Sequence, residues 1–494
     1  MDKGGQDPHA QLKIDEIYNA IGMGKAHLLV LITGGLFVMT HHSDSMGMSI
    51  IAPSGSCDLN LDNYLESDLM QSTFIGMIIS AYYVGYLSDV YGRRKVMLYS
   101  CPFHFCCSIL SSFMQEYKYY LLMRVMTGFF LSGTVVPVLT YVGEFCTNYY
   151  RAEIVNYTSM FNGFGMIYYP AMAHFILHTD WRVQYAFITY RPWRLLAVTF
   201  IFPAVIGYIL LLLFLPESPR FLMATNQIDK AHDALNWLAQ KNKGKTLDDL
   251  NIERIVPFPV PIVKRKYIWV VDVWLDLLPI FERAPFIAQF ILSCIVMFGL
   301  YFVVNGIGFW FTDLRNQSAY YKQVHLDYSE KTMCEKIESF PFRERNKEVC
   351  MEYVKHFEGA IITGACFVVG YIIMGVLLLY YKRKKIFTSA LLISFLSGLS
   401  LSIGKGPWIE LLCPIFFLGI PNILVNFVNS SVMDHFPTFL RNKAVSIVLM
   451  FGRFGTVAGA QVGIYIQYKW CLLAFTLFPG VILASATLSL FLML

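Results

Sequence analysis

Long apolar stretches recur along almost the whole chain and constrain its fold more than any other feature. A helix needs about 20 predominantly apolar residues to cross the hydrocarbon core of a bilayer. Twelve stretches meet this length: 26–52, 68–87, 96–114, 119–141, 153–177, 195–215, 288–311, 358–380, 386–403, 408–430, 443–466 and 470–493. Only 15% of the 494 residues are charged, whereas an ordinary soluble domain has about 25%. The sequence therefore predicts an all-α membrane protein with twelve transmembrane helices.

The distribution of basic residues indicates which side of the membrane each loop faces. Arg93, Arg94 and Lys95 lie in the second loop and residues 382–385 in the eighth, so both loops are expected in the cytosol. The 312–357 loop, which this topology places outside, holds eight Lys and Arg residues and weighs against it. Residues 1–25 carry charges throughout and do not match a signal peptide. We expect both termini to be cytosolic.

An offset of 290 residues aligns several marks in the two parts of the chain, as a duplication of six helices would. The pairs are Gly85 with Gly375, Arg93 with Arg383, Arg94 with Lys384, Lys95 with Lys385, Glu144 with Asp434, and Arg151 with Arg441. The expected organisation is a cytosolic segment (1–25), a first half (26–215), a cytosolic linker (216–285) and a second half (286–494).

The charged turn between the second and third stretches carries the most specific motif. Residues 85–94 have the pattern G-x-L-x-D-x-x-G-R-R, which resembles the signature loop between helices 2 and 3 of the major facilitator superfamily. The resemblance implies the major facilitator fold and a gating loop. Its expected residues are Gly85, Asp89, Gly92, Arg93 and Arg94. The family usually has a base directly after the acid, where this chain has Val90.

Further marks follow in the order that the superfamily has them. They are RVMTG (124–128), GEFCTNYYR (143–151), PESPRFL (216–222) and FPTFLR (436–441). The resemblance implies charge relays at helix ends, Glu144 with Arg151 and Asp434 with Arg441. The short loop after the first stretch and the long 312–357 loop are similar to the synaptic vesicle glycoprotein 2 family, within the organic ion transporter-like branch.

Polar residues inside the apolar stretches are candidates for a substrate cavity, because charges at membrane depth are costly. Asp44 and His41 share one helical face, and we expect them either to face the cavity or to form a structural pair. Arg124 would contact substrate or pair with an acid such as Glu410. The other candidates are Asn305, Tyr169, Asn422, Asn426 and Asn429; the last three could equally join helices by hydrogen bonds.

The loops add three further expectations. Cys334 and Cys350 are the only cysteines in the 312–357 loop, and we expect a disulfide between them on the oxidising side. Asn316 begins an N-glycosylation acceptor. Residues 228–240 alternate like a short amphipathic helix, which would serve as a structural latch.

The predicted function is transport of a small polar or ionic organic solute by alternating access, with or without a coupling proton or ion. A non-transporting membrane glycoprotein that binds a protein partner is the alternative. Nothing in the sequence points to an enzyme, a cofactor, a metal site or nucleic-acid binding. We expect a monomer in the plasma membrane or in an intracellular vesicle.

Overall fold

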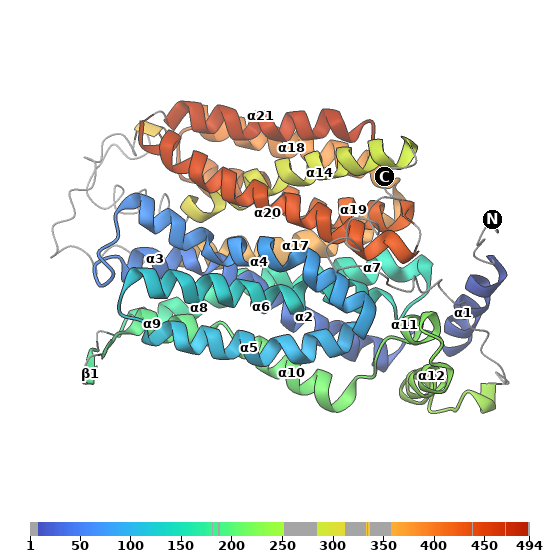
Figure 1. The fold of residues 1–494 in the computed structure, drawn as a ribbon. Coiled ribbons are helices and arrows are strands. Elements are labelled where there is room, and N and C mark those ends of the chain that lie inside the picture. The colour runs from blue at the N-terminus through green and yellow to red at the C-terminus, as the bar shows by residue number, and fades with distance from the viewer. Residues whose placement is uncertain are drawn as a thin grey trace.

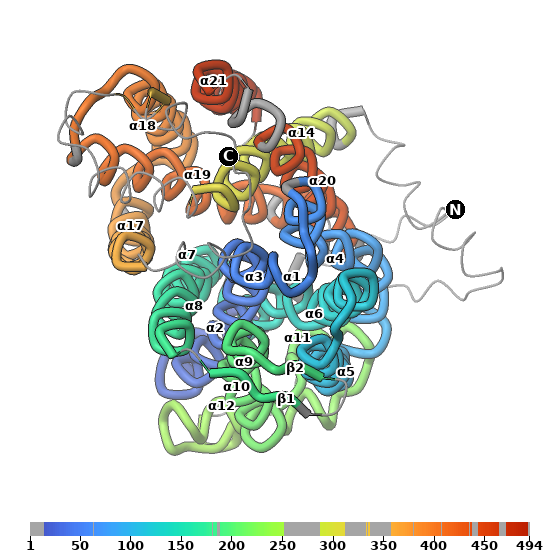
Figure 2. Tube along the Cα trace, turned by 90° about the vertical axis from the view of Figure 1, so that its left-hand side faces the viewer, coloured from blue at the N-terminus to red at the C-terminus, as the bar shows by residue number. Residues whose placement is uncertain are grey.

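The computed structural model describes residues 8–179, 181–185, 188–250, 284–311, 332, 334–335, 357–436, 438–469 and 471–492. Helices α2 to α10 form one bundle: α2 (Lys25–Met46), α3 (Met48–Gly55), α4 (Asn63–Tyr91), α5 (Arg93–Phe113), α6 (Tyr117–Gly143), α7 (Asn148–Ser159), α8 (Phe161–Leu177), α9 (Pro192–Thr199) and α10 (Phe202–Phe214). A second bundle contains α14 (Ala284–Val304), α17 (Glu358–Tyr380), α18 (Arg383–Ile403), α19 (Pro407–His435), α20 (Thr438–Lys469) and α21 (Cys471–Ser489). Figure 1 shows the long helices running roughly parallel to one another, and Figure 2 shows the second bundle lying above the first.

Among the described residues, eleven helical segments are long and apolar enough to cross a membrane. Each coincides with one of the twelve predicted stretches. The remaining stretch, 153–177, falls on α7 and α8, which meet at Met160 with nearly helical angles (φ −56°, ψ −25°). There the amide of Gly163 donates to the carbonyl of Met160 at 2.9 Å, so the turn is tightened rather than broken.

Apolar side chains cover the outer surface of the bundles as well as their interior. On α10, Phe202, Ile206 and Leu213 are 52%, 54% and 66% exposed. Exposed apolar side chains of this kind, continuous along a helix, are expected where lipid is the solvent. The outward face of α10 therefore agrees with the predicted membrane protein.

The 290-residue offset reappears in the boundaries of the helices. α5 begins at Arg93 and α18 at Arg383, and both contain 21 residues. Helices α6 and α19 begin at Tyr117 and Pro407, again 290 positions apart. The two bundles thus repeat the same succession of helices in this region.

The bundles pack against each other through α4 with α20, through α8 with α17 and through α7 with α17. Small residues set the first and the last of these contacts. A Cβ on Gly85 would lie 2.4 Å from Ser446 Oγ, and one on Gly375 would lie 3.0 Å from the hydroxyl of Tyr157. These distances leave no room for a larger side chain without a local shift, so the two glycines permit close approach of the bundles.

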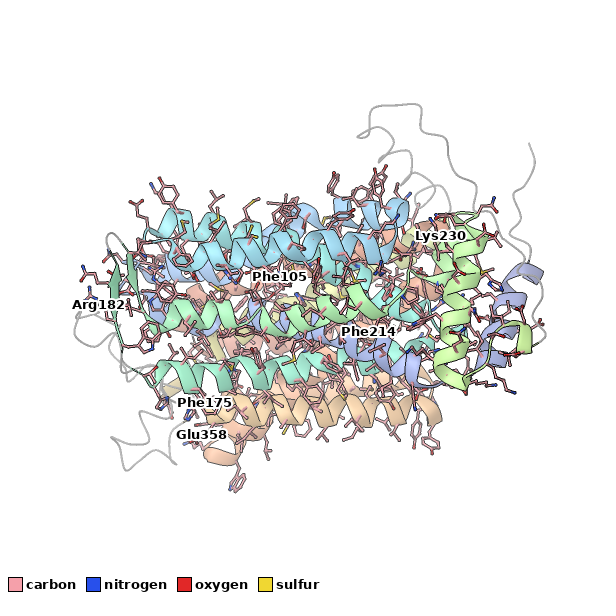
Figure 3. All side chains as sticks on the ribbon, turned by 90° about the horizontal axis from the view of Figure 1, so that it is seen from below. Phe105, Phe175, Arg182, Phe214, Lys230 and Glu358 are labelled. Atoms are coloured by element: carbon pink, nitrogen blue, oxygen red, sulfur yellow. A yellow bond between two sulfur atoms is a disulfide. The ribbon has the colours of Figure 1, made fainter. Side chains whose placement is uncertain are left out.

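Different elements cover the two ends of the molecule. At one end, which we call the α12 end, lie α1 (Pro8–Ile21), α11 (Pro219–Ala224), α12 (Ile228–Lys243) and the 3₁₀ turn Asp248–Leu250. At the other, the hairpin end, β1 (Val183–Tyr185) pairs antiparallel with β2 (Ile188–Tyr190). In Figure 3, Lys230 and Arg182 mark these opposite ends.

The helix predicted at 228–240 is present as α12, and it packs on the first bundle through α1, α11 and α2. Arg220 pairs with Asp15 of α1 at 2.8 Å. The side-chain amide of Asn242 donates to the carbonyl of Gly22 at 2.8 Å, and its oxygen accepts from the amide of Ala26 at 2.9 Å. These bonds fix the entry of the chain into α2.

The predicted disulfide between Cys334 and Cys350 is wrong. Cys334 is bonded to Cys471 at the start of α21, with the two Cα atoms 5.6 Å apart. Cys57 is also disulfide-bonded. Cys350 and the predicted glycosylation residue Asn316 lie outside the described residues.

Candidate functional site

A cavity lies between the two bundles. Its empty volume is about 630 Å³, including space open to solvent. The first bundle contributes His42, Met46, Met166 and Tyr169; the second contributes Val304, Asn305, Gly308, Phe311, Ala360, Thr363, Phe367, Leu418 and Asn422. A site shared by two bundles can change its access when they move relative to each other.

Two buried polar atoms in the cavity wall have no hydrogen-bond partner in the described part of the chain. They are Nε2 of His42, on α2, and Nδ2 of Asn422, on α19. A buried polar group without a partner is costly, so each such group requires an explanation. These two belong to opposite bundles and line the same space.

Three of the predicted cavity residues line this cavity: Asn305, Tyr169 and Asn422. Asn305 also donates to Thr456 Oγ1 at 3.0 Å, and the ring of Tyr169 lies 6.2 Å from that of His42. Asn426 is not among the lining residues; it accepts a hydrogen bond from Ser159 at 3.1 Å. Asn429, 2% exposed, also lies away from the cavity.

Asp44 lies in a separate buried cluster within the first bundle. Its Oδ1 accepts from Arg124 Nη2 at 2.6 Å, and its Oδ2 lies 3.2 Å from Nε2 of His104. The side chains of Asp44 and Arg124 are fully buried and do not line the cavity. The structure therefore pairs Arg124 with Asp44, where the sequence suggested substrate or Glu410.

The predicted histidine partner of Asp44 is also replaced. His41 Nδ1 lies 3.4 Å from Ser45 Oγ, while His104 on α5 occupies the second oxygen of Asp44. Sequence reasoning missed His104. A histidine inside an apolar stretch was the available signal, because ionisable groups at membrane depth are functional candidates.

A charged cluster surrounds the predicted gating loop at the α12 end. Arg93 pairs with Asp89 at 3.2 Å and with Glu144 at 3.1 Å. The Arg93 guanidinium also lies 4.9 Å from the ring centre of Phe221. The last turn of α4, the residue that follows α6, and α11 therefore meet at a single arginine.

Glu217, from the PESPRFL segment, completes this cluster. Its carboxylate accepts from the backbone amides of Arg94 at 3.0 Å and Lys95 at 3.4 Å, and so caps the first turn of α5. Burial raises the pKa of Glu217, while the amides of Arg94 and Ser218 act in the opposite direction.

The turn before α5 depends on a glycine. Gly92 has φ +105°, and a Cβ there would lie 2.4 Å from Glu217 Oε2. Both observations require glycine at this position.

Of the other residues in the predicted charge relays, the structure describes the side-chain contacts of Arg151 alone. Arg151 Nε donates to the carbonyl of Gly143 at 3.4 Å. Asp434 lies in α19 and Arg441 in α20, and their side chains are outside the described part of the chain. Arg383, the counterpart of Arg93, donates to Ser430 Oγ at 3.3 Å.

Comparisons with known proteins agree with this architecture. The family model "Sugar (and other) transporter" matches residues 29–259. Synaptic vesicle glycoprotein 2C of Rattus norvegicus is 26% identical over 319 residues, which cover 60% of this chain and 44% of that protein. Synaptic vesicle glycoprotein 2B of Mus musculus is 29% identical over 230 residues, covering 46% and 34%. The chain thus spans less than half the length of these relatives.

Solved structures of the proton:xylose symporter XylE have the same fold. The form bound to 6-bromo-6-deoxy-D-glucose has a TM-score of 0.64 at 16% identity and covers 96% of this chain and 95% of its own. The partially occluded inward-open form of the E. coli transporter has a TM-score of 0.64 at 14% identity, with 95% and 100% covered. The chain is an all-α membrane protein with the major facilitator fold. Within that class it resembles the synaptic vesicle glycoprotein 2 branch.

Proposed function

We propose that this protein is a secondary transporter that carries a small organic solute by alternating access. The cavity between the bundles carries the proposal, because His42 and Asn422 reach it from opposite bundles with unpartnered polar atoms. A solute held by both bundles interacts differently with the open and the closed arrangement, and transport by alternating access requires this difference. The likeness to a sugar transporter family model and to a xylose symporter supports this function.

We further propose that a proton is coupled to transport through Asp44. The carboxylate, the Arg124 guanidinium and the His104 imidazole form a fully buried set of ionisable groups on three helices of one bundle. Protonation of Asp44 would weaken its pair with Arg124. The carbonyl of Asp44, 3.2 Å from Arg124 Nη2 in the structure, would then be the remaining acceptor of Arg124 among the described residues. A change of protonation would then alter the packing of α2 against α6.

The cluster at the α12 end is proposed as the gate. Arg93 holds Asp89 of α4 beside Glu144, which directly follows α6. Gly85, also on α4, packs against Ser446 of the second bundle. Movement of α4 during opening would therefore be coupled to this ion-pair cluster. We place the α12 end in the cytosol, in agreement with the basic residues in the loops, and the protein in the plasma membrane or a vesicle membrane.

The direct test is solute uptake into proteoliposomes between pH 5.5 and 8, with and without an imposed proton gradient. The wild-type protein should accumulate solute when the gradient is applied. Asp44→Asn should lose this accumulation and its pH dependence, whereas Asp249→Asn, at an exposed acid outside the membrane, should keep both. Superimposable normalised pH profiles for wild type and Asp44→Asn would exclude the coupling role. The absence of any flux through folded protein would favour the partner-binding glycoprotein instead.

A further inference from the structure

Resting on the proposed transport function, we propose that the solute is uncharged and compact, with an apolar body and one hydrogen-bonding group held between His42 and Asn422. The central cavity, rather than the name of the matching family, carries this assignment. It implies that a polyol such as a hexose is a poor occupant.

The absence of charge in the wall is the first observation. Among the described residues, no Asp, Glu, Lys or Arg lines the cavity. Two buried charges of the bundles have partners of their own: Asp44 is bound by Arg124 and His104, and Arg453 donates to the carbonyl of Met77 at 2.9 Å. An ionic solute would lose its hydration without meeting an opposite charge, which is strongly unfavourable.

The polar groups of the wall are the second observation. Thr363 donates to the carbonyl of Gly359 at 2.8 Å, and Asn305 donates to Thr456. His42 Nε2 and Nδ2 of Asn422 remain without protein partners in the described part of the chain. One group that can both donate and accept, such as a primary amide, would satisfy this pair.

The apolar part of the wall is the third observation. Met46, Met166, Val304, Phe311, Phe367 and Leu418 lie between and around the polar residues. A hexose carries hydroxyl groups on every side, and those facing these side chains would lose their hydrogen bonds to water without replacement. An apolar ring or chain would instead bury its surface favourably there.

The location of the two polar groups connects recognition to conformation. His42 is on α2 of the first bundle and Asn422 on α19 of the second. A solute that bonds to both favours the arrangement in which the bundles are together. Binding should therefore stabilise the protein against heat, independently of whether solute is carried across the membrane.

A series of solutes built on one six-membered ring tests the assignment. The purified full-length protein is heated in detergent with cyclohexanecarboxamide, cyclohexanecarboxylate, cyclohexylammonium or glucose, and the melting temperature is followed against concentration. The carboxamide should raise the melting temperature at the lowest concentration. A larger or equal effect from the carboxylate, the ammonium ion or glucose would overturn the proposal.

Variants locate the binding. Asn422→Ala and His42→Ala should each weaken carboxamide binding about tenfold, as loss of one buried hydrogen bond predicts. Asn429→Ala, on the same helix but away from the cavity, is the matched control and should bind normally. Asn422→Leu keeps a branched side chain of similar length, removes the amide and should weaken binding as well, which covers the case in which the alanine variant does not fold. Equal weakening by Asn429→Ala would refute the location.

The binding and transport claims can fail separately. Carboxamide binding without flux of any solute would leave this assignment intact and contradict the transport function. Counterflow of glucose without carboxamide binding would do the reverse.

Discussion

Breaking the buried ion pair between Asp44 and Arg124 should cost far more stability than removing both charges together. Both side chains are fully buried, and the charged atoms are 2.6 Å apart. At an effective dielectric constant of ~20, two unit charges at this separation attract by about 6 kcal/mol. Desolvation of the two ions offsets much of this attraction, but loss of one partner leaves the other charge buried alone, at a cost of about 3–5 kcal/mol.

We therefore expect Asp44→Asn to lower the free energy of unfolding by about 3–5 kcal/mol, and Arg124→Gln to do the same. The double variant, which places two neutral amides at these positions, should lose less than about 2 kcal/mol, because no uncompensated charge remains. The measurement is unfolding in mixed detergent and SDS micelles, followed by circular dichroism, with a double-mutant cycle to extract the coupling energy.

A partly exposed ion pair provides the control. Arg191 pairs with Asp58 at 2.9 Å near the hairpin end, and the two side chains are 24% and 16% exposed. Asp58→Asn should cost only about 1 kcal/mol through this ion pair, because the amide oxygen of asparagine can still accept the hydrogen bond from Trp193. Additive effects of the two single substitutions at Asp44 and Arg124 would refute the proposed coupling.

Three further outcomes are expected. Gly92→Ala should lower the melting temperature and the free energy of unfolding by about 1–3 kcal/mol, because it combines φ +105° with a contact on Glu217, whereas Gly480→Ala, whose Cβ meets nothing within 4 Å, should have little effect. Peptide mapping without reduction should recover Cys334 linked to Cys471; free thiols at both positions would contradict the structure. Burial raises the folded pKa of Glu217, so its contribution to stability is present below its unfolded pKa of about 4.3 and is lost as the pH rises through its folded pKa. The melting temperature of wild type minus that of Glu217→Gln should therefore fall between pH 4 and 7, and a rise would show that the amide bonds of the carboxylate dominate.

The helices could be predicted because membrane insertion requires a property that is local in sequence. An apolar stretch of sufficient length is visible without knowledge of its neighbours, and the predicted repeat is reproduced by the equal lengths of α5 and α18. The tight turn at Met160 was not predicted. Residues 159–162 contain neither proline nor glycine, so no residue in the sequence marks the turn.

The candidate site was harder to predict than the helices, because residues that meet there are far apart in the sequence. Helical periodicity places His41 near Asp44, but it cannot place His104 or Arg124, which are 60 and 80 positions away. The disulfide prediction failed for the same reason. It paired two cysteines of one loop, whereas Cys334 is bonded to Cys471, 137 positions away. Of the three amides spaced along α19, Asn422 alone lines the cavity, whereas Asn426 accepts from Ser159 of the first bundle and Asn429 is buried away from the cavity.

The contacts at Gly85 and Gly375 have a consequence for assembly. The residue 290 positions before Ser446 is Asn156, the neighbour of Tyr157, so each glycine meets nearly the same position of the opposite half. In a two-fold symmetric dimer of identical subunits, one such contact would necessarily occur twice. At these two contacts the seam between the bundles therefore has the approximate two-fold form of a dimer interface. Each half retains a surface complementary to the other, and we expect the two halves, co-expressed as separate polypeptides, to find each other in the membrane and assemble.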